Sequence, residues 1–361
     1  MKVTIITVCY NSVKTIEKTI QSVQLQAYED LEYIIIDGGS TDGTLDIIDA
    51  YKNDVSLCIS EPDNGIYDAM NKGIRHATGD IIGIINSDDW YEADTVRRVA
   101  AYFKGNEVDV VYGKILVVDT RGVVKAPDER PLNTLWYQMA APHPSVFIKR
   151  NIYEKYGLFD TRYKISADYE LLLRLYSKGV RFGFMNRVMA YFRSGGACDI
   201  HRKLGKEEGY EIAFRYIGAC ENREMIFPLL NREKQWFNFE IRIVQDPFFM
   251  QELLYKYFNS DIDEIVIFGT GEWGKRCCRA LQNSNIEVAF FVDNRAQEYQ
   301  KIDGKTVKTT SGLKYLEQYI LVAVKDSEDI VRQLDELDMK KYVTIERLLD
   351  SSLNRVGNIC K

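Results

Sequence analysis

Short apolar runs alternate with amphipathic stretches through the first hundred residues. The apolar runs predict buried β-strands at 2–8, 31–36, 55–59 and 80–85. Apolar residues at helical spacing predict helices after them, at about 13–23, around 45–48, at 67–77 and at 91–103. Asn11 or Ser12 is expected to cap the first helix. This alternation favours a mostly parallel sheet with helices on both faces.

The pattern changes twice further along the chain. More strands are predicted at 108–112, 114–119 and 146–148, before a helix at 169–177 that ends near Gly179. Residues 200–258 are aromatic-rich and helical in pattern, which predicts a helical layer packed on the first domain or a surface that docks a partner or membrane. A second alternating unit begins at Asp263. We therefore expect an α/β domain at 1–199, a helical extension at 200–260 and a small α/β domain at 261–361.

Composition narrows the classes of function. Lysine and arginine number 47 against 53 acidic residues, for a net charge of −6, which argues against a nucleic-acid partner. No run approaches the roughly 20 apolar residues that span a bilayer, and the first residues lack a leader pattern, so a cytoplasmic location is expected. The seven cysteines are expected to be reduced. The three histidines are scattered, so any bound metal should be a hard cation held by oxygen atoms.

Polar residues follow the predicted strands of the first domain. Tyr10 and Asn11 follow the first strand, Asp37 follows the second, and residues 86–89, Asn-Ser-Asp-Asp, follow the fourth. Ligands of open α/β sheets bind at the carboxyl ends of the strands, so these residues predict a pocket. The paired carboxylates would repel each other unless a cation or a basic group lay between them. A hard cation there, Mn²⁺ or Mg²⁺, would bridge the protein to a diphosphate. The alternative is an acidic cap on the next helix.

Several segments of the first half occur in a characteristic order: TVCYN, IIIDGGSTDGT, EPDNGIYDAMNKGI, GDIIGIINSDDW, HPSVF and SADYELLLR. In this order they resemble the family-2 glycosyltransferases, which have a nucleotide-sugar-binding GT-A fold. The resemblance covers about residues 1–195. It implies a GT-A mixed, mostly parallel sheet flanked by helices, and a donor of the nucleotide-sugar class, with UDP the expected carrier.

The resemblance also implies roles for individual residues. The nucleotide pocket would be lined by Thr7, Tyr10 and Asn11, and Asp37 would accept hydrogen bonds from the base. The nucleotide and diphosphate would be flanked by Asp63, Gly65, Asn71 and Lys72. Asp88 would be the metal ligand, helped by Asp89. The sequence departs from the family's D-x-D element at Asn86, an amide that can bind a sugar or ribose hydroxyl but is a poor cation ligand.

Asp168 matches the family's catalytic base, near the start of the helix at 169–177. It would deprotonate an acceptor hydroxyl attacking the anomeric carbon from the opposite face, which inverts that centre. The helix dipole is expected to lower its pKa. Glu170 is the alternative base or a solvated helix residue. His143, in HPSVF, would contact the acceptor or the diphosphate, or would be an ordinary packed histidine.

The chain lacks the QxxRW motif and membrane helices of the family's processive synthases. The resemblance therefore implies a single-addition enzyme with a glycan or lipid-linked glycan acceptor. Peripheral association with the inner membrane surface and homo-oligomerisation are left open. A non-catalytic protein that binds a nucleotide-sugar is an alternative, which would not need Asp168.

The small C-terminal domain carries a second motif. Gly269, Gly271 and Gly274 form a GxGxxG between a strand and a helix, with Asp293 about 20 residues further on. FVDNR followed by KIDGKTV resembles the small Rossmann-like domain that precedes some sugar acyltransferases, where it binds a nucleotide-sugar. Three alternatives stay open for this domain: no ligand, a nucleotide site, or NAD(P), the last making the protein an oxidoreductase.

Overall fold

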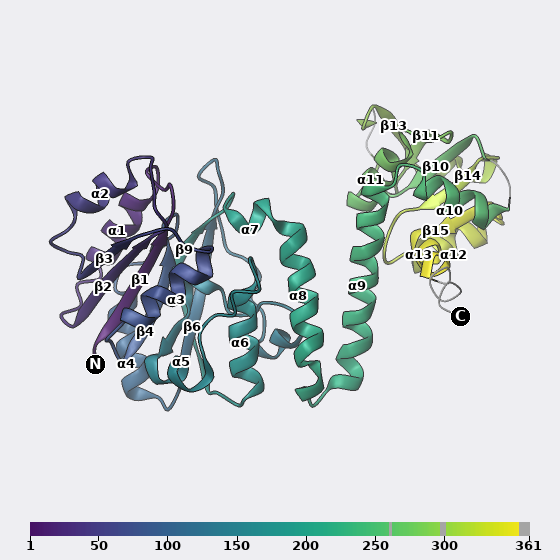
Figure 1. Ribbon diagram of the computed structural model, residues 1–361. Coiled ribbons are helices and arrows are strands. Elements are labelled where there is room, and N and C mark those ends of the chain that lie inside the picture. The colour runs from purple at the N-terminus through teal and green to yellow at the C-terminus, as the bar shows by residue number, and fades with distance from the viewer. Residues whose placement is uncertain (260–261, 297–300, 354–361) are drawn as a thin grey trace. The chain divides into compact units, whose positions relative to one another are not determined.

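The computed structural model describes residues 1–259, 262–296 and 301–353. The chain divides into two compact units, Met1–Leu230 and Asn231–Lys361, each described here by itself. Figure 1 shows the order of the elements along the chain. No helix in the described part of the chain has the length and apolar character needed to cross a bilayer. The helical stretch predicted at 200–260 is divided between the two units.

The first unit is built on one mixed sheet. Its strands follow the order β3-β2-β1-β4-β8-β6-β9-β5, with β7 paired to β6. Their bounds are β1 Val3–Cys9, β2 Leu31–Asp37, β3 Leu57–Ser60, β4 Ile81–Asn86, β5 Trp90–Tyr91, β6 Val110–Val118, β7 Val124–Lys125, β8 Phe147–Lys149 and β9 Phe182–Arg193. The strands β1 to β4 are parallel, and β8 is antiparallel to both β4 and β6. The mixed, mostly parallel sheet flanked by helices is thus confirmed.

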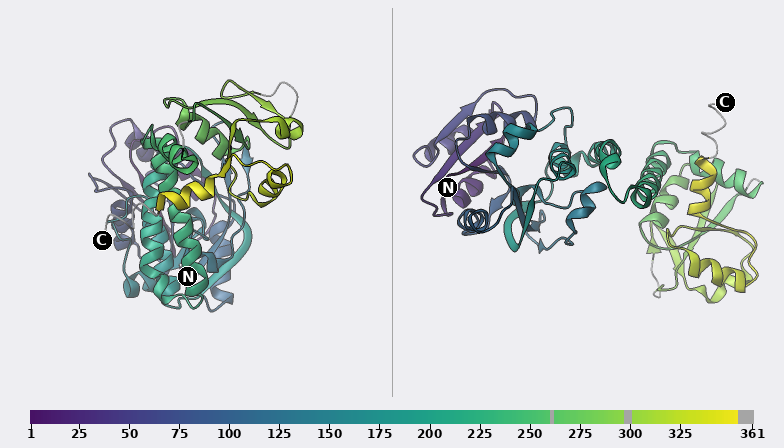
Figure 2. Two further views of the ribbon diagram at one scale, coloured as in Figure 1. Left: turned by 90° about the vertical axis from the view of Figure 1, so that its right-hand side faces the viewer. Right: turned by 90° about the horizontal axis from the view of Figure 1, so that it is seen from below.

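Helices cover both faces of this sheet (Figures 1 and 2). The helices of this unit are α1 Ile16–Gln24, α2 Thr44–Ala50, α3 Ile66–His76, α4 Thr95–Gly105, α5 Arg150–Tyr156, α6 Ala167–Ser177, α7 Ala197–Ile200 and α8 Arg202–Tyr216, of which α8 packs against α6. Alternating residues of each strand enter two separate cores, because successive side chains point to opposite faces. Ile6 packs with Met70 of α3 on one face, and Ile5 packs with Ile20 of α1 and Val99 of α4 on the other.

Some local predictions were wrong. The first helix begins at Ile16 without a side-chain cap, because Asn11 has a positive φ of 49° and the backbone carbonyl of Ser12 accepts the first turn's amides. The helix predicted from residue 91 begins at Thr95, since Trp90 and Tyr91 pair with β9. One unbroken strand, β6, replaces the two predicted at 108–119. The sequence analysis did not predict β9 at all.

The second unit contains another sheet, of order β12-β13-β11-β10-β14-β15, whose strands are parallel except for the short β12. The strands are β10 Glu264–Phe268, β11 Glu287–Val292, β12 Lys301–Ile302, β13 Lys305–Lys308, β14 Tyr319–Val322 and β15 Tyr342–Thr344. The helices are α9 Arg223–Gln245, which begins in the first unit, α10 Phe249–Phe258, α11 Glu272–Leu281, α12 Glu328–Glu336 and α13 Ile345–Leu353.

The helices of the segment 200–258, predicted to form one layer, pack in two different places. Glu208 of α8 accepts backbone hydrogen bonds from residues 164–166, so α8 belongs to the first domain as predicted. Phe249 and Leu253 of α10 instead lie in the core of the second unit with Ile265. The prediction that the whole segment packs on the first domain was therefore wrong beyond α8.

Candidate active site

The carboxyl ends of β1, β2 and β4 lie side by side. In the strand register Cys9 pairs with Asp37 and Val8 pairs with Asn86. The hydroxyl oxygens of Ser12 and Ser87, which follow β1 and β4, are 2.7 Å apart. The polar strand ends that the sequence singled out therefore meet at one edge of the sheet.

Asp37 lies inside this edge and is 0% exposed. Its carboxylate accepts hydrogen bonds from the backbone amides of Gly39 and Ser40, at 3.0 and 2.9 Å, and from the hydroxyls of Ser40 and Ser60. Burial opposes ionisation, but the Ser40 and Ser60 hydrogen bonds outweigh it and lower the pKa of Asp37. Both carboxylate oxygens serve the protein's own loop, so Asp37 is placed to support the pocket.

Thr7 is also 0% exposed, and its hydroxyl lies 3.0 Å from that of Tyr33. By contrast Tyr10 is 64% exposed. Asn11 is exposed too, although its side-chain oxygen accepts the amide of Thr41 at 3.0 Å. Of these three residues, Tyr10 therefore has an exposed side chain that could contact a ligand.

Asp63 approaches the same edge through the space that a glycine leaves. A Cβ on Gly38 would stand 2.5 Å from Oδ2 of Asp63 and 3.4 Å from the ring of Tyr10. Oδ1 of Asp63 accepts the amide of Gly65 at 2.8 Å, which fixes the side chain, and Gly65 has a φ of +113°. Oδ2 takes no hydrogen bond from the described residues. The absence of a side chain at position 38 thus brings a carboxylate next to Tyr10.

Lys72 and Asn71 hold the segment behind this carboxylate. The amino group of Lys72 lies 2.8 Å from Glu61 and 3.1 Å from the carbonyl of Pro62. The Asn71 side chain is buried and joins α3 to Phe159 by two hydrogen bonds, of 2.9 and 3.0 Å, to the backbone carbonyl and amide. Both residues brace the loop in this structure.

We predict that Asn71→Ala lowers the free energy of unfolding by about 2–4 kcal/mol, because it leaves the buried amide and carbonyl of Phe159 without partners. Urea unfolding followed by circular dichroism would measure this loss. Asn64→Ala, on the exposed loop before α3, is the control and should change stability by less than about 0.5 kcal/mol. Equal effects of the two changes would contradict the bracing role.

The residues after β4 differ in what they can bind. Asn86 has a buried side-chain oxygen that finds no hydrogen-bond partner in the described part of the chain, and Asp88 is half-buried with its Oδ2 facing Gly196. Burial raises the pKa of Asp88, an effect that nearby Arg193 opposes. Asp89 is 1% exposed, and burial followed by repulsion from Asp88 raises its pKa well above the usual range. Asp88 is the more accessible of the two carboxylates and therefore the first candidate for a cation ligand, with Asp89 directly beside it.

One oxygen of the Asp89 carboxylate has a structural partner, whereas its Oδ2 is buried and has no hydrogen-bond partner among the described residues. Its Oδ1 accepts the amide of Arg193 at 2.9 Å, which ties the segment after β4 to β9. Within the described ranges no cluster of three histidine, cysteine or acidic side chains that could hold a metal is found. A cation at Asp88 would therefore take most of its coordinating oxygen atoms from a bound diphosphate and from water.

Asp168 lies in the first turn of α6. Its Oδ1 accepts the amide of Tyr169 at 2.8 Å and lies 3.1 Å from the hydroxyl of Tyr67. That hydroxyl is also 2.7 Å from the carbonyl of Ile165, so its single proton serves one acceptor at a time. Burial raises the pKa of Asp168, and His143 and the hydrogen bonds offset it only in part. The lowering expected from the helix dipole is thus outweighed, which favours a base.

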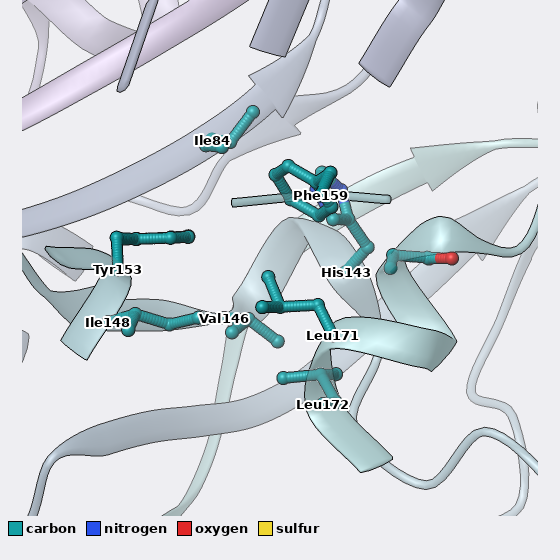
Figure 3. A pocket seen from close by; sticks show the side chains of 9 residues that line it. Ile84, His143, Val146, Ile148, Tyr153, Phe159, Leu171 and Leu172 are labelled. Carbon is teal, nitrogen blue, oxygen red and sulfur yellow. The ribbon is translucent and has the colours of Figure 1, made fainter. Parts of the chain in front are cut away.

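His143 lies behind this carboxylate in an apolar setting. Figure 3 shows His143 beside Phe159, with Ile84, Val146 and Leu171 around them. Burial lowers the pKa of His143, while Asp168 acts in the opposite direction. A neutral imidazole is therefore favoured at pH 7. Glu170, the alternative base, is 2% exposed and pairs with Arg174 at 3.0 Å, so the prediction of a solvated helix residue was wrong.

A cavity of about 550 Å³ opens beside Asp168. Asn86, His143 and Cys198 also line it, together with many apolar side chains. Burial and then the charges of Asp168, Asp199, Asp89 and Asp88 raise the pKa of Cys198 to about 12, which places the acidic residues after β4 close to the same cleft. Four residues here were not predicted as site residues. Tyr67 lies within the segment EPDNGIYDAMNKGI but was given no role, and no motif marks Arg193, Gly196 or Cys198, which the fold brings here.

The glycine-rich turn of the second unit has internal partners. Asp293 accepts hydrogen bonds from the amide and hydroxyl of Thr270, at 3.0 and 2.6 Å, and from the amide of Arg295. Burial opposes ionisation of Asp293, but the Thr270 hydrogen bonds outweigh it and lower its pKa. A Cβ on Gly274 would stand 1.9 Å from the carbonyl oxygen of Gly269, whereas one on Gly271 would meet nothing within 4 Å. The three alternatives for this turn, no ligand, a nucleotide or NAD(P), therefore stay open.

Known proteins resemble both parts of the chain. Residues 4–169 match the family described as glycosyl transferase family 2, and residues 261–345 match the family described as C2185-like, N-terminal. Among solved structures, a crystal structure of Staphylococcus aureus TarS 1-349 is similar, with a TM-score of 0.50 and 21% identity over 70% of this chain and 79% of that one. That likeness shows the fold of the first unit.

Curated relatives align over about half of this chain. A PGL/p-HBAD biosynthesis glycosyltransferase of Mycobacterium tuberculosis is 32% identical over 183 residues, which are 49% of this chain and 71% of that protein. An Escherichia coli protein named UDP-Glc:alpha-D-GlcNAc-diphosphoundecaprenol beta-1,3-glucosyltransferase WfaP is 27% identical over 53% of this chain and 76% of its own length. On this evidence the chain belongs to glycosyltransferase family 2 and is a glycosyltransferase.

Proposed function

We propose that the protein is a non-processive, inverting glycosyltransferase that moves one sugar from a UDP-sugar to a hydroxyl of a glycan or lipid-linked acceptor. The observation that carries this proposal is the position of Asp168. One oxygen of its carboxylate is held by the amide of Tyr169, and the residue lines a cleft beside the ends of the parallel strands. The names of the relatives, one of which uses a UDP-sugar and a lipid-linked acceptor, agree with it.

In this proposal Tyr10 and Asp63 bind the nucleoside. The exposed ring of Tyr10 stacks on the base, and the open Oδ2 of Asp63, facing Gly38, accepts the N3–H of uracil. Asp37, the residue first expected to contact the base, supports the loop at 38–40 instead. Lys72 keeps the Asp63 loop in place through Glu61.

The cation is proposed at Asp88. The buried, unpartnered oxygen of Asn86 and the raised pKa of Asp88 both fit a site that gains stability when a cation or a ligand donor arrives. When bound, Mn²⁺ or Mg²⁺ would neutralise charge on the departing diphosphate. The side-chain amide of Asn86 would donate to a ribose or sugar hydroxyl oxygen, and its oxygen would accept a hydroxyl proton.

Asp168 would perform the proton transfer. It takes the proton of the acceptor hydroxyl as that oxygen bonds to the anomeric carbon and the bond between that carbon and the diphosphate oxygen breaks. Tyr67 donates to the ionised carboxylate, and it can turn its proton to the carbonyl of Ile165 once Asp168 is protonated. The amide of Tyr169 contacts the same oxygen of Asp168 in both protonation states.

We expect UDP to bind with Mn²⁺ present, and we expect Asp63→Asn to weaken that binding by about 10- to 100-fold, because it removes a charge-assisted hydrogen bond. Isothermal titration calorimetry with UDP would measure both. The control is Asp46→Asn, an exposed acid on α2 that should leave the affinity unchanged.

Two outcomes would count against the proposal. Unchanged UDP affinity in Asp63→Asn would refute the assignment of the base contact. A thermal-shift screen in which no nucleoside-diphosphate sugar raises the melting temperature would refute the donor class as a whole, since a ligand at 100 times its Kd stabilises the folded state by about 2.7 kcal/mol.

A further inference from the structure

A second cavity, of about 410 Å³, continues the cleft beside Asp168 along β6. The two cavities share Ile115, Ala140 and Pro142 and the segment around 127–130. Their wall follows β6 from Tyr112 to Val117, a distance of roughly 17 Å at about 3.3 Å for each residue. The acceptor side of the cleft is therefore much longer than one sugar ring.

The two ends of this channel carry different polar groups. Asn86, His143, Lys164 and Asp168 belong only to the first cavity. Among the residues that line only the second cavity, Leu116, Phe184 and Val188 are apolar, while Lys114 and Glu129 form an ion pair with each other. Where the cavities meet, Arg130 donates to the carbonyl of Met139 at 3.1 Å. The far end thus offers mainly apolar surface; Lys114 and Glu129 neutralise each other there, and Asp128 lies where the two cavities meet.

A glycan that filled this channel would place hydroxyls against the apolar side chains Leu116, Phe184 and Val188, and burying a hydroxyl there without a partner is costly. An apolar chain or ring in the same space gains free energy from every methylene removed from water. Phe184, which is 41% exposed at the far end, would be covered by such a group.

We propose that the acceptor is an amphiphile: its sugar lies at Asp168 and an apolar aglycone occupies the channel along β6. This inference rests on the proposed function and adds the class of acceptor. In this proposal the channel binds the apolar group that is attached directly to the reacting sugar, and so favours acceptors that carry one. A plain oligosaccharide is the competing acceptor, and the test below separates the two.

The test compares methyl, butyl and octyl glycosides of the same sugars as acceptors, with UDP-sugar donors and Mn²⁺. We expect the KM to fall on the order of three- to fourfold for each methylene that enters the channel, and kcat to change little. A KM that is the same for methyl and octyl glycosides, or lower for an unsubstituted oligosaccharide, would overturn the inference. Hydrolysis of the donor by water, followed as UDP release, reports on the proposed function separately.

A variant pair tests the location. Phe184→Asn should reduce the ratio of kcat/KM for octyl against methyl glycosides by about tenfold, since it removes apolar surface from the far end of the channel. Val124→Asn replaces an equally exposed apolar residue on β7, which lines neither cavity, and should leave that ratio unchanged. A ratio that is unaltered in Phe184→Asn would place the aglycone elsewhere.

Discussion

Asp168→Asn should lower kcat by about 10²- to 10⁴-fold, because the amide cannot take the proton of the acceptor hydroxyl. The change preserves the shape of the side chain and its contact with the amide of Tyr169, so UDP binding should be unaffected. Steady-state transfer assays at saturating donor, together with UDP titrations, would separate the loss of chemistry from a loss of binding.

The dependence on pH gives an independent check. Since burial raises the pKa of Asp168, the fraction in the ionised, active form falls as pH drops through a value above that of an ordinary aspartate. The acidic limb of kcat should therefore lie above the usual aspartate range in the wild type and should disappear from the residual activity of Asp168→Asn. Asp160→Asn, in the loop before α6, is the matched control. Retention of near-normal turnover by Asp168→Asn would refute the proposed mechanism.

Asp88→Asn should cost on the order of 10²-fold in transfer and remove most of the Mn²⁺ dependence of UDP binding. The physical reason is that a hard cation needs the anionic oxygen of Asp88, for which Asn86 is a poor substitute. Calorimetry with UDP, with Mn²⁺ or with EDTA, provides a readout that does not depend on turnover.

A nearby acidic residue controls for charge. Asp94→Asn changes a half-exposed side chain at the start of α4, where asparagine tolerates the positive φ of 63°. It should leave Mn²⁺ dependence intact. If wild-type UDP binding and transfer were the same in Mn²⁺ and in EDTA, the protein would bind its donor without a metal and the role given to Asp88 would be wrong.

The sequence was informative where local pattern and topology act together. Apolar runs predicted β1, β2 and β4, and parallel strands necessarily bring their carboxyl ends to one edge. Asp37 and Asn86 could be placed there without coordinates. The order of the motifs then predicted the family, which the comparisons confirmed.

Other features depend on side-chain direction and on long-range pairing. The carboxylate of Asp37 is engaged by the hydroxyls of Ser40 and Ser60, and the strand pattern does not reveal these hydrogen bonds. The strand β9 escaped prediction because it alternates weakly and contains polar residues such as Asn186 and Arg187. The raised pKa of Asp168 needs the burial supplied by surrounding elements, whereas the sequence shows only its place near a helix start.

The glycine-rich turn of the second unit bears on how such domains change over evolutionary time. Gly274 is required by the backbone itself, since any side chain there would collide with the carbonyl of Gly269, whether or not a ligand is present. Gly271 faces open space and has an ordinary φ of −70°, so only a closely approaching phosphate or similar group would keep it a glycine. Related domains that no longer bind a ligand should therefore vary at position 271 but keep glycine at 274. Comparing natural sequences at these two positions would distinguish a domain that has only kept its backbone structure from one that binds a ligand.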